Sequence, residues 1–132
     1  MGLNITKLFA VDVTKENEGV WLDIGEGIQV KVAAEGNQNY QKFFEDAVTP
    51  IRTSAAKMPQ SFWDDLTAKA RANTILLDWK GVTDDSGAEV AYTADQGIPL
   101  FAERANHVIA ELIISKARDQ SSYKAEEVAA KN

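Results

Sequence analysis

The sequence contains no cysteine and a single histidine, His107, among its 132 residues. The absence of cysteine excludes disulfides, thiolate nucleophiles, iron–sulfur clusters and every cysteine-based zinc site. One histidine is too few for a histidine-rich metal site or an H-E-x-x-H motif. We therefore expect neither a metal site nor a cofactor.

Long apolar runs and positive charge are also scarce. No stretch approaches the roughly 18 apolar residues that a membrane helix needs, and Lys7 interrupts residues 1–11, which lack the apolar core of a signal peptide. Fourteen Lys and Arg face twenty Asp and Glu, which gives a formal net charge of -6. Proteins that bind nucleic acid carry an excess of Lys and Arg that contacts the phosphates, and this chain has an excess of acidic residues instead. We therefore expect a cytoplasmic protein without nucleic-acid or membrane partners.

The composition, 45% hydrophobic and 26% charged, is typical of a soluble globular chain, and the length fits a single domain over residues 1–132. Residues 1–35 are β-rich and residues 37–78 favour two helices. Residues 79–93 form an acidic loop, and residues 94–132 are expected to be helical with a partly exposed C-terminal end. Residues 78–103 carry one basic and six acidic groups, so the negative charge is concentrated there.

The fold class is predicted as α+β, with an N-terminal β-hairpin or small antiparallel sheet followed by about four helices. Two short β-rich runs, Val20–Gly25 and Ile28–Val32, flank a glycine-bounded turn and indicate the hairpin. Leu8–Thr14 alternates in a way that could add a third strand. From Asn37 onward, apolar residues recur at helical spacing, and Pro50 is placed to end that helix.

Later helices follow from capping signals and periodicity. Ser61 with Asp64 has capping-box spacing and predicts the start of a second helix, whose apolar side extends through Ile75–Leu77. Thr93 with Gln96 predicts a short helix. A final helix, expected to be the longest, spans Ala105 to about Ala130.

Candidate partner-binding residues lie on that final helix and in the acidic loop. Beyond Ala117 the apolar stripe thins, so this half either docks on a partner or frays as a chain end. The candidate contacts share exposure or apolar character at these two places: Ile109, Leu112, Ile113, Tyr123, Val128, Asp84 and Asp85.

No arrangement of residues indicates catalysis. Positions 84, 86 and 88 are Asp, Ser and Ala, which does not meet the EF-hand order, so a tight Asp-Ser-Gly turn is the better interpretation. The adjacent pairs Asp64–Asp65 and Asp84–Asp85 are poorly spaced to face one substrate. No nucleophile motif is present. We expect that the protein is not an enzyme.

Several blocks together resemble the small tail assembly chaperones of long-tailed bacteriophages. The early blocks are Val20–Gly25 with Ile28–Val32, and Asn37-x-x-Tyr40-Gln41 at a helix start. The later blocks are Leu76–Val82, Asp84–Gly87, Val90–Thr93 and Ser122–Glu127 ahead of Lys131-Asn132. The sequence departs from the family at Gly97 and Pro99, which interrupt a segment that family members tend to keep helical.

The resemblance implies a non-enzymatic assembly factor of the bacterial host cytoplasm, absent from the mature virion. It implies binding to the tape measure protein and the tail tube protein, and a longer product made by ribosomal frameshifting. An alternative class is a virion structural protein of the neck or tail, such as a tail completion or connector component. A small hydrolase of unfamiliar type is a third, for which the sequence offers no strong candidate pocket.

Overall fold

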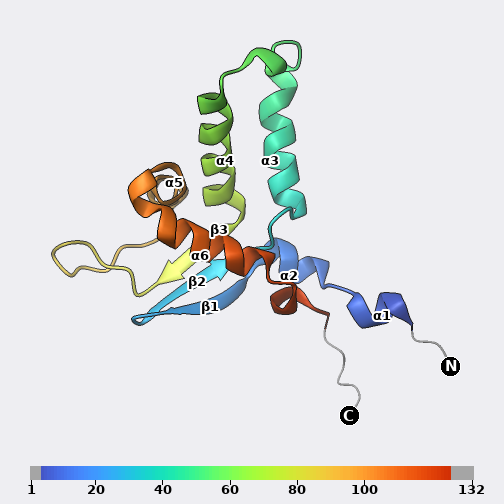
Figure 1. Ribbon diagram of the computed structural model, residues 1–132. Helices are drawn as coiled ribbons and strands as arrows, with labels where there is room; N and C mark the ends of the chain where they lie inside the picture. Colours follow the sequence, from blue (N-terminus) through green and yellow to red (C-terminus); the bar gives the residue numbers. More distant parts are fainter. Residues whose placement is uncertain (1–3, 126–132) are drawn as a thin grey trace.

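The computed structural model describes residues 4–125 as a small three-stranded sheet with helices packed on it (Figure 1). The sheet is antiparallel with the order β1-β2-β3, from β1 (Val20–Gly25), β2 (Ile28–Val32) and β3 (Leu76–Lys80). The predicted hairpin is confirmed, with Leu22 opposite Val30 and Trp21 opposite Lys31. The α+β class is therefore correct.

The third strand is β3 and not the predicted Leu8–Thr14. That region forms α1 (Ile5–Phe9) and α2 (Val13–Glu18), because the Asp12 carboxylate caps α2 by accepting the Thr14 and Lys15 amides at 3.0 and 3.2 Å. Residues 76–77, expected on a helix, instead belong to β3, which pairs along β2 and places Trp79 opposite Val30. Pairing with β2 overrides the local helical pattern here.

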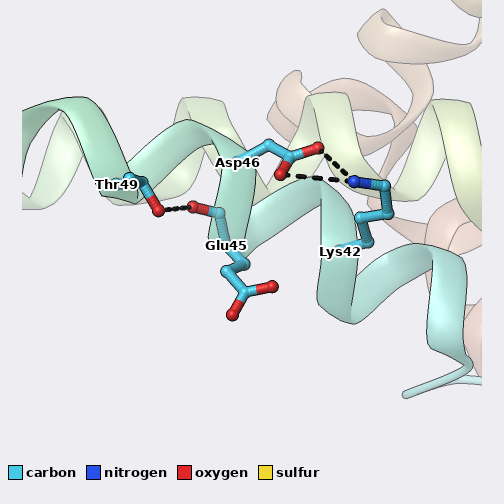
Figure 2. Close-up of polar contacts among 4 residues, drawn as sticks. All are labelled: Lys42, Glu45, Asp46 and Thr49. Carbon is cyan, nitrogen blue, oxygen red and sulfur yellow. Dashed lines mark hydrogen bonds and ion pairs between the residues drawn. The ribbon is translucent and has the colours of Figure 1, made fainter.

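Two antiparallel helices, α3 (Gln38–Val48) and α4 (Gln60–Thr74), rise from the sheet as a hairpin (Figure 1). The helix predicted from Asn37 is confirmed, and Pro50 falls in the 3-10 turn Thr49–Ile51 that follows it. The outer side of α3 is polar: Lys42 pairs with Asp46 at 3.1 Å, and the Thr49 hydroxyl donates to the Glu45 carbonyl (Figure 2). The apolar side of α3 is left to pack on α4.

The start of α4 differs from the prediction. Ser61 is not its cap: the helix begins at Gln60 after Pro59, and Asp64 accepts from the Gln60 side-chain amide at 2.9 Å. With 15 residues, α4 is the longest helix in the described part of the chain. It is followed by β3 and, after the acidic loop and the predicted Thr93 cap, by α5 (Ala94–Ala102). Helical structure therefore continues through Gly97 and Pro99.

The last helix, α6 (His107–Arg118), lies across one face of the sheet (Figure 1). Its inner side and the sheet form the core, whose buried members are Val30, Val32, Ile75, Leu76, Ile113, Ile114 and Ala117. The expected extension to Ala130 is wrong in the described region, because α6 ends at Arg118 and a 3-10 turn, Gln120–Tyr123, follows. None of the helices between residues 4 and 125 is long and apolar enough to span a bilayer.

Candidate partner-binding surfaces

Four of the seven exposed large apolar side chains in the described part of the chain lie on α1 and at the start of α2. Ile5, Leu8 and Phe9 share one face of α1 because they are spaced i, i+3 and i+4, and Val13 follows at the start of α2. We call these four residues the N-terminal apolar patch. Ile5 is 68% exposed and Phe9 71%, and no residue of α1 is buried. An apolar helix face that is exposed to this extent in the described part of the chain can serve as a partner-binding element.

The sequence pattern does not predict this patch, because the alternation over Leu8–Thr14 favours a strand there. A usable signal was present: Asn4 stands three residues before Lys7, and its side chain accepts the Lys7 amide at 3.1 Å as the cap of α1. Asp12 supplies the matching signal for α2. Two cap residues eight positions apart indicate two short helices rather than one strand.

A second apolar surface lies on the outer side of α6. Val108 is 71% exposed and Leu112 37%, and they lie one turn apart, so they form a continuous pair that we call the α6 pair. The predicted contact Ile109 is half-buried beside them, whereas Ile113 is only 1% exposed and belongs to the core. Of the three predicted α6 contacts, only Leu112 and part of Ile109 are accessible.

Tyr123 is also inaccessible, contrary to the expectation of exposure beyond Ala117. It is 1% exposed, and its hydroxyl donates to the Val32 carbonyl at 2.9 Å. The chain reaches this position because the Asp119 carboxylate accepts from the Ser121 amide and hydroxyl, which ends α6 and turns the backbone. Burial, with a smaller contribution from Asp119 and Glu16, raises the pKa of Tyr123 to about 12. Val128 lies outside the described residues.

The acidic loop forms the predicted tight turn. The Asp84 carboxylate accepts hydrogen bonds from the Ser86 hydroxyl at 2.7 Å and from the Ser86 and Ala88 amides at 2.9 and 3.0 Å. These bonds, the hydroxyl first, hold the pKa of Asp84 below its usual value. Asp85 is exposed and makes no hydrogen bond or ion pair with any described residue. Asp84 is thus committed to the loop, and Asp85 is available to a partner.

The base of the acidic loop is fixed by aromatic residues from the blocks that carry the chaperone resemblance. The Trp79 indole donates to the Val90 carbonyl at 2.8 Å and packs edge-on against Tyr92, with ring centroids 4.8 Å apart. The Tyr92 hydroxyl donates to the Ala72 carbonyl in α4, and burial raises its pKa. These side chains hold the loop against the body, a structural role.

The candidate residues do not converge on one site. The acidic loop projects on the side opposite α1 (Figure 1), and the α6 pair lies on the helix that crosses between them. Among residues 4–125, no group of three or more His, Asp or Glu is placed to hold a metal ion.

Comparison with known families places the chain among proteins encoded by prophages. It belongs to the YdaY prophage protein family, whose family model matches residues 35–132, or 98 of the 132 positions. Neither the curated proteins nor the solved structures contain a match to this chain. The acidic loop and α6 lie within the matched region, whereas the N-terminal apolar patch precedes it.

Proposed function

We propose that this prophage protein is a non-enzymatic tail assembly chaperone that binds a tape measure protein, keeps it soluble and helps recruit tail tube subunits. The observation that supports this function best is the N-terminal apolar patch, a helix face with no partner among the described residues. The choice of a tape measure protein as the partner rests on the sequence blocks that resemble tail assembly chaperones.

The physical reasoning concerns how a soluble protein masks an aggregating one. A tape measure protein is largely a long helix with an apolar stripe, and such a stripe pairs with apolar residues presented at i and i+4. The N-terminal apolar patch and the α6 pair both present this spacing. The net charge of -6 on this chain favours solubility, because like-charged molecules repel one another.

Co-expression with the tape measure protein of the same prophage tests the proposal. We expect the wild-type chain to move the tape measure protein into the soluble fraction and to co-purify with it. The double variant I5S/F9S should lose this effect, since each large apolar side chain that is buried contributes about 1.5–3 kcal/mol. The variant T6A/K7A, on the other face of the same helix, is the matched control.

An insoluble tape measure protein beside abundant wild-type chain would contradict the proposed function. Rescue by I5S/F9S equal to wild type would remove α1 from the binding surface, and V108S/L112S then tests the α6 pair in the same assay. The pair of variants therefore separates the function from its location.

Two further measurements address persistence in the particle and the longer product. A chaperone should be absent from purified virions by immunoblot, whereas a neck or tail structural protein would remain. Expression of the native gene with its downstream DNA should yield a minor longer species with the same N-terminal region, detected by intact mass. A single product together with presence in virions would favour the structural alternative.

A further inference from the structure

A groove with a volume of about 520 Å³ opens between α4, α5 and α6. Its apolar floor includes Leu100, Phe101 and Ile114. The chain has four arginines in total, and three of them, Arg71, Arg104 and Arg118, line this groove, together with the only histidine. Three arginines in one groove contrast with the net charge of -6 of the whole chain.

The three arginines differ in what they already bind. Arg118 is committed, because its guanidinium donates to both Glu35 carboxylate oxygens at 2.7 and 3.1 Å. The Nε of Arg71 is buried without a hydrogen-bond partner among the described residues. Arg104 is exposed and forms no ion pair within residues 4–125. The buried Nε of Arg71 is out of reach of a second molecule, so the donors on offer are the Arg104 guanidinium and the part of the Arg71 side chain that lines the groove. A guanidinium binds a carboxylate in a bidentate manner.

Two carboxylates reduce the positive charge of the groove. Glu103 and Glu111 also line it, so the two arginines that are not paired with Glu35 share the lining with two glutamates. Such a mixed lining is a poor site for a polyanion, whose dense phosphates would meet both glutamates. It suits a short segment with two or three carboxylates at fixed positions, which can approach the arginines and avoid the glutamates.

The same chain presents a segment of that kind. Residues 83–89, which we call the acidic hairpin, carry Asp84, Asp85 and Glu89, and Thr83 bridges Glu89 across its base. Because Asp84 is used within the turn, the hairpin is held in shape while Asp85 and Glu89 are exposed. A preorganised segment loses little conformational entropy when it docks.

We propose that the acidic hairpin of one copy docks in the arginine-lined groove of a second copy, with Asp85 and Glu89 meeting Arg104 and Arg71. The hairpin is joined to the start of α5, and the groove lies at the other end of that helix, about 13 Å away by helical rise. A copy whose groove is filled still presents its own hairpin. The contact is therefore head-to-tail, and it builds rings or open chains.

Sedimentation of the purified chain over a concentration series tests this contact without any tape measure protein, so its outcome is separate from that of the proposed function. We expect the mean mass to rise with concentration and to fall as salt is added, because the contact is ionic. The charge reversals R104E and D85K/E89K should each weaken self-association at least about tenfold. The matched controls, R52E and E45K/D46K, carry the same net charges away from both surfaces and should associate as the wild type does.

Mixing the two variants gives the deciding result. R104E retains a working hairpin and D85K/E89K a working groove, so an equimolar mixture should recover the association that each variant alone has lost. This recovery also shows that both variants are folded. A wild-type chain that stays monomeric at every concentration would overturn the proposal, as would variants that associate like their controls. A mixture that remains monomeric would overturn it as well.

Discussion

Asn37 is the residue whose replacement should most clearly expose how the helical hairpin is attached to the sheet. Its side chain is 4% exposed and makes three hydrogen bonds. The amide oxygen accepts the Tyr40 amide at 3.0 Å and so caps α3, while the amide nitrogen donates to the Ala34 and Thr74 carbonyls at 2.7 and 3.0 Å. One side chain thereby joins the end of β2, the start of α3 and the end of α4.

The free energy of unfolding lost in N37A follows from these three bonds. Loss of the helix cap costs about 1 kcal/mol. The Ala34 carbonyl keeps the backbone amide of residue 37 as a donor at 3.2 Å, so the main further loss is a buried Thr74 carbonyl without a partner, about 1–3 kcal/mol. The total is about 2–4 kcal/mol, or a fall in Tm of roughly 3–6 °C for each kcal/mol.

The variant N37D separates the two roles. It retains an oxygen that can cap α3, but at neutral pH it places a carboxylate against two carbonyl oxygens. We therefore expect a loss at least as large as in N37A, with the pKa of the new carboxyl raised in the folded state. A group with a raised pKa in the folded state stabilises fully below its unfolded-state pKa, and this contribution is lost as pH rises through its folded-state pKa. N37D should therefore lose stability as pH rises from acid to neutral.

Denaturant unfolding followed by circular dichroism at several pH values measures both effects. The matched controls are N39A and N39D, which make the same changes at an exposed position in the first turn of α3. N39D should be neutral or slightly stabilising, since a carboxylate near a helix N-terminus is favourable. An N37A variant within about 0.5 kcal/mol of wild type, or an N37D variant as stable as wild type at neutral pH, would refute the assigned bonds.

Three further predictions concern packing, pH and the acidic loop. Gly97→Ala in α5 should destabilise the fold by about 1–3 kcal/mol in thermal unfolding, because its methyl group would overlap the Tyr92 ring and hydroxyl. The exposed control Q96A should change the stability little, and a G97A variant more stable than wild type would contradict the packing. The raised pKa of Tyr123 predicts that its contribution to the free energy of unfolding is complete below about pH 10 and falls as pH rises to about 12. In denaturant titrations, Y123F should make the free energy of unfolding depend less on pH in this range. An unchanged pH dependence would argue against the buried hydroxyl. Asp84→Ala should speed amide hydrogen exchange at residues 86 and 88 with little change in global stability; unchanged exchange would show that the carboxylate does not hold the turn.

Local patterns predicted the elements whose signal lies within a few neighbouring residues. The hairpin follows from alternation around a glycine turn, and α3 follows from helical periodicity after the Asn37 cap. The tight turn at Asp84 and the cap at Thr93 are equally local. In each case the residues that decide the structure lie in one continuous short segment, so sequence patterns contain the information.

The sequence predictions were wrong where a segment distant in the sequence determines the local structure. Leu76 and Leu77 continue a helical pattern, but the free edge of β2 recruits them into β3. Tyr123 has the spacing of an exposed tail, yet its hydroxyl meets a carbonyl of β2. The arginine-lined groove collects residues from three helices, so its lining cannot be recognised from sequence spacing alone.

The junction between the two ends of the described chain has a consequence for folding. The Asp12 amide donates to the Tyr123 carbonyl at 2.7 Å, and the Ala125 amide donates to the Ala10 carbonyl at 3.2 Å. These bonds close a loop of more than about a hundred residues, whose entropy loss must be offset by contacts made elsewhere first. We expect this junction to form last during folding and to open first during unfolding. The orientation of α1 is then fixed only when Tyr123 reaches its buried position.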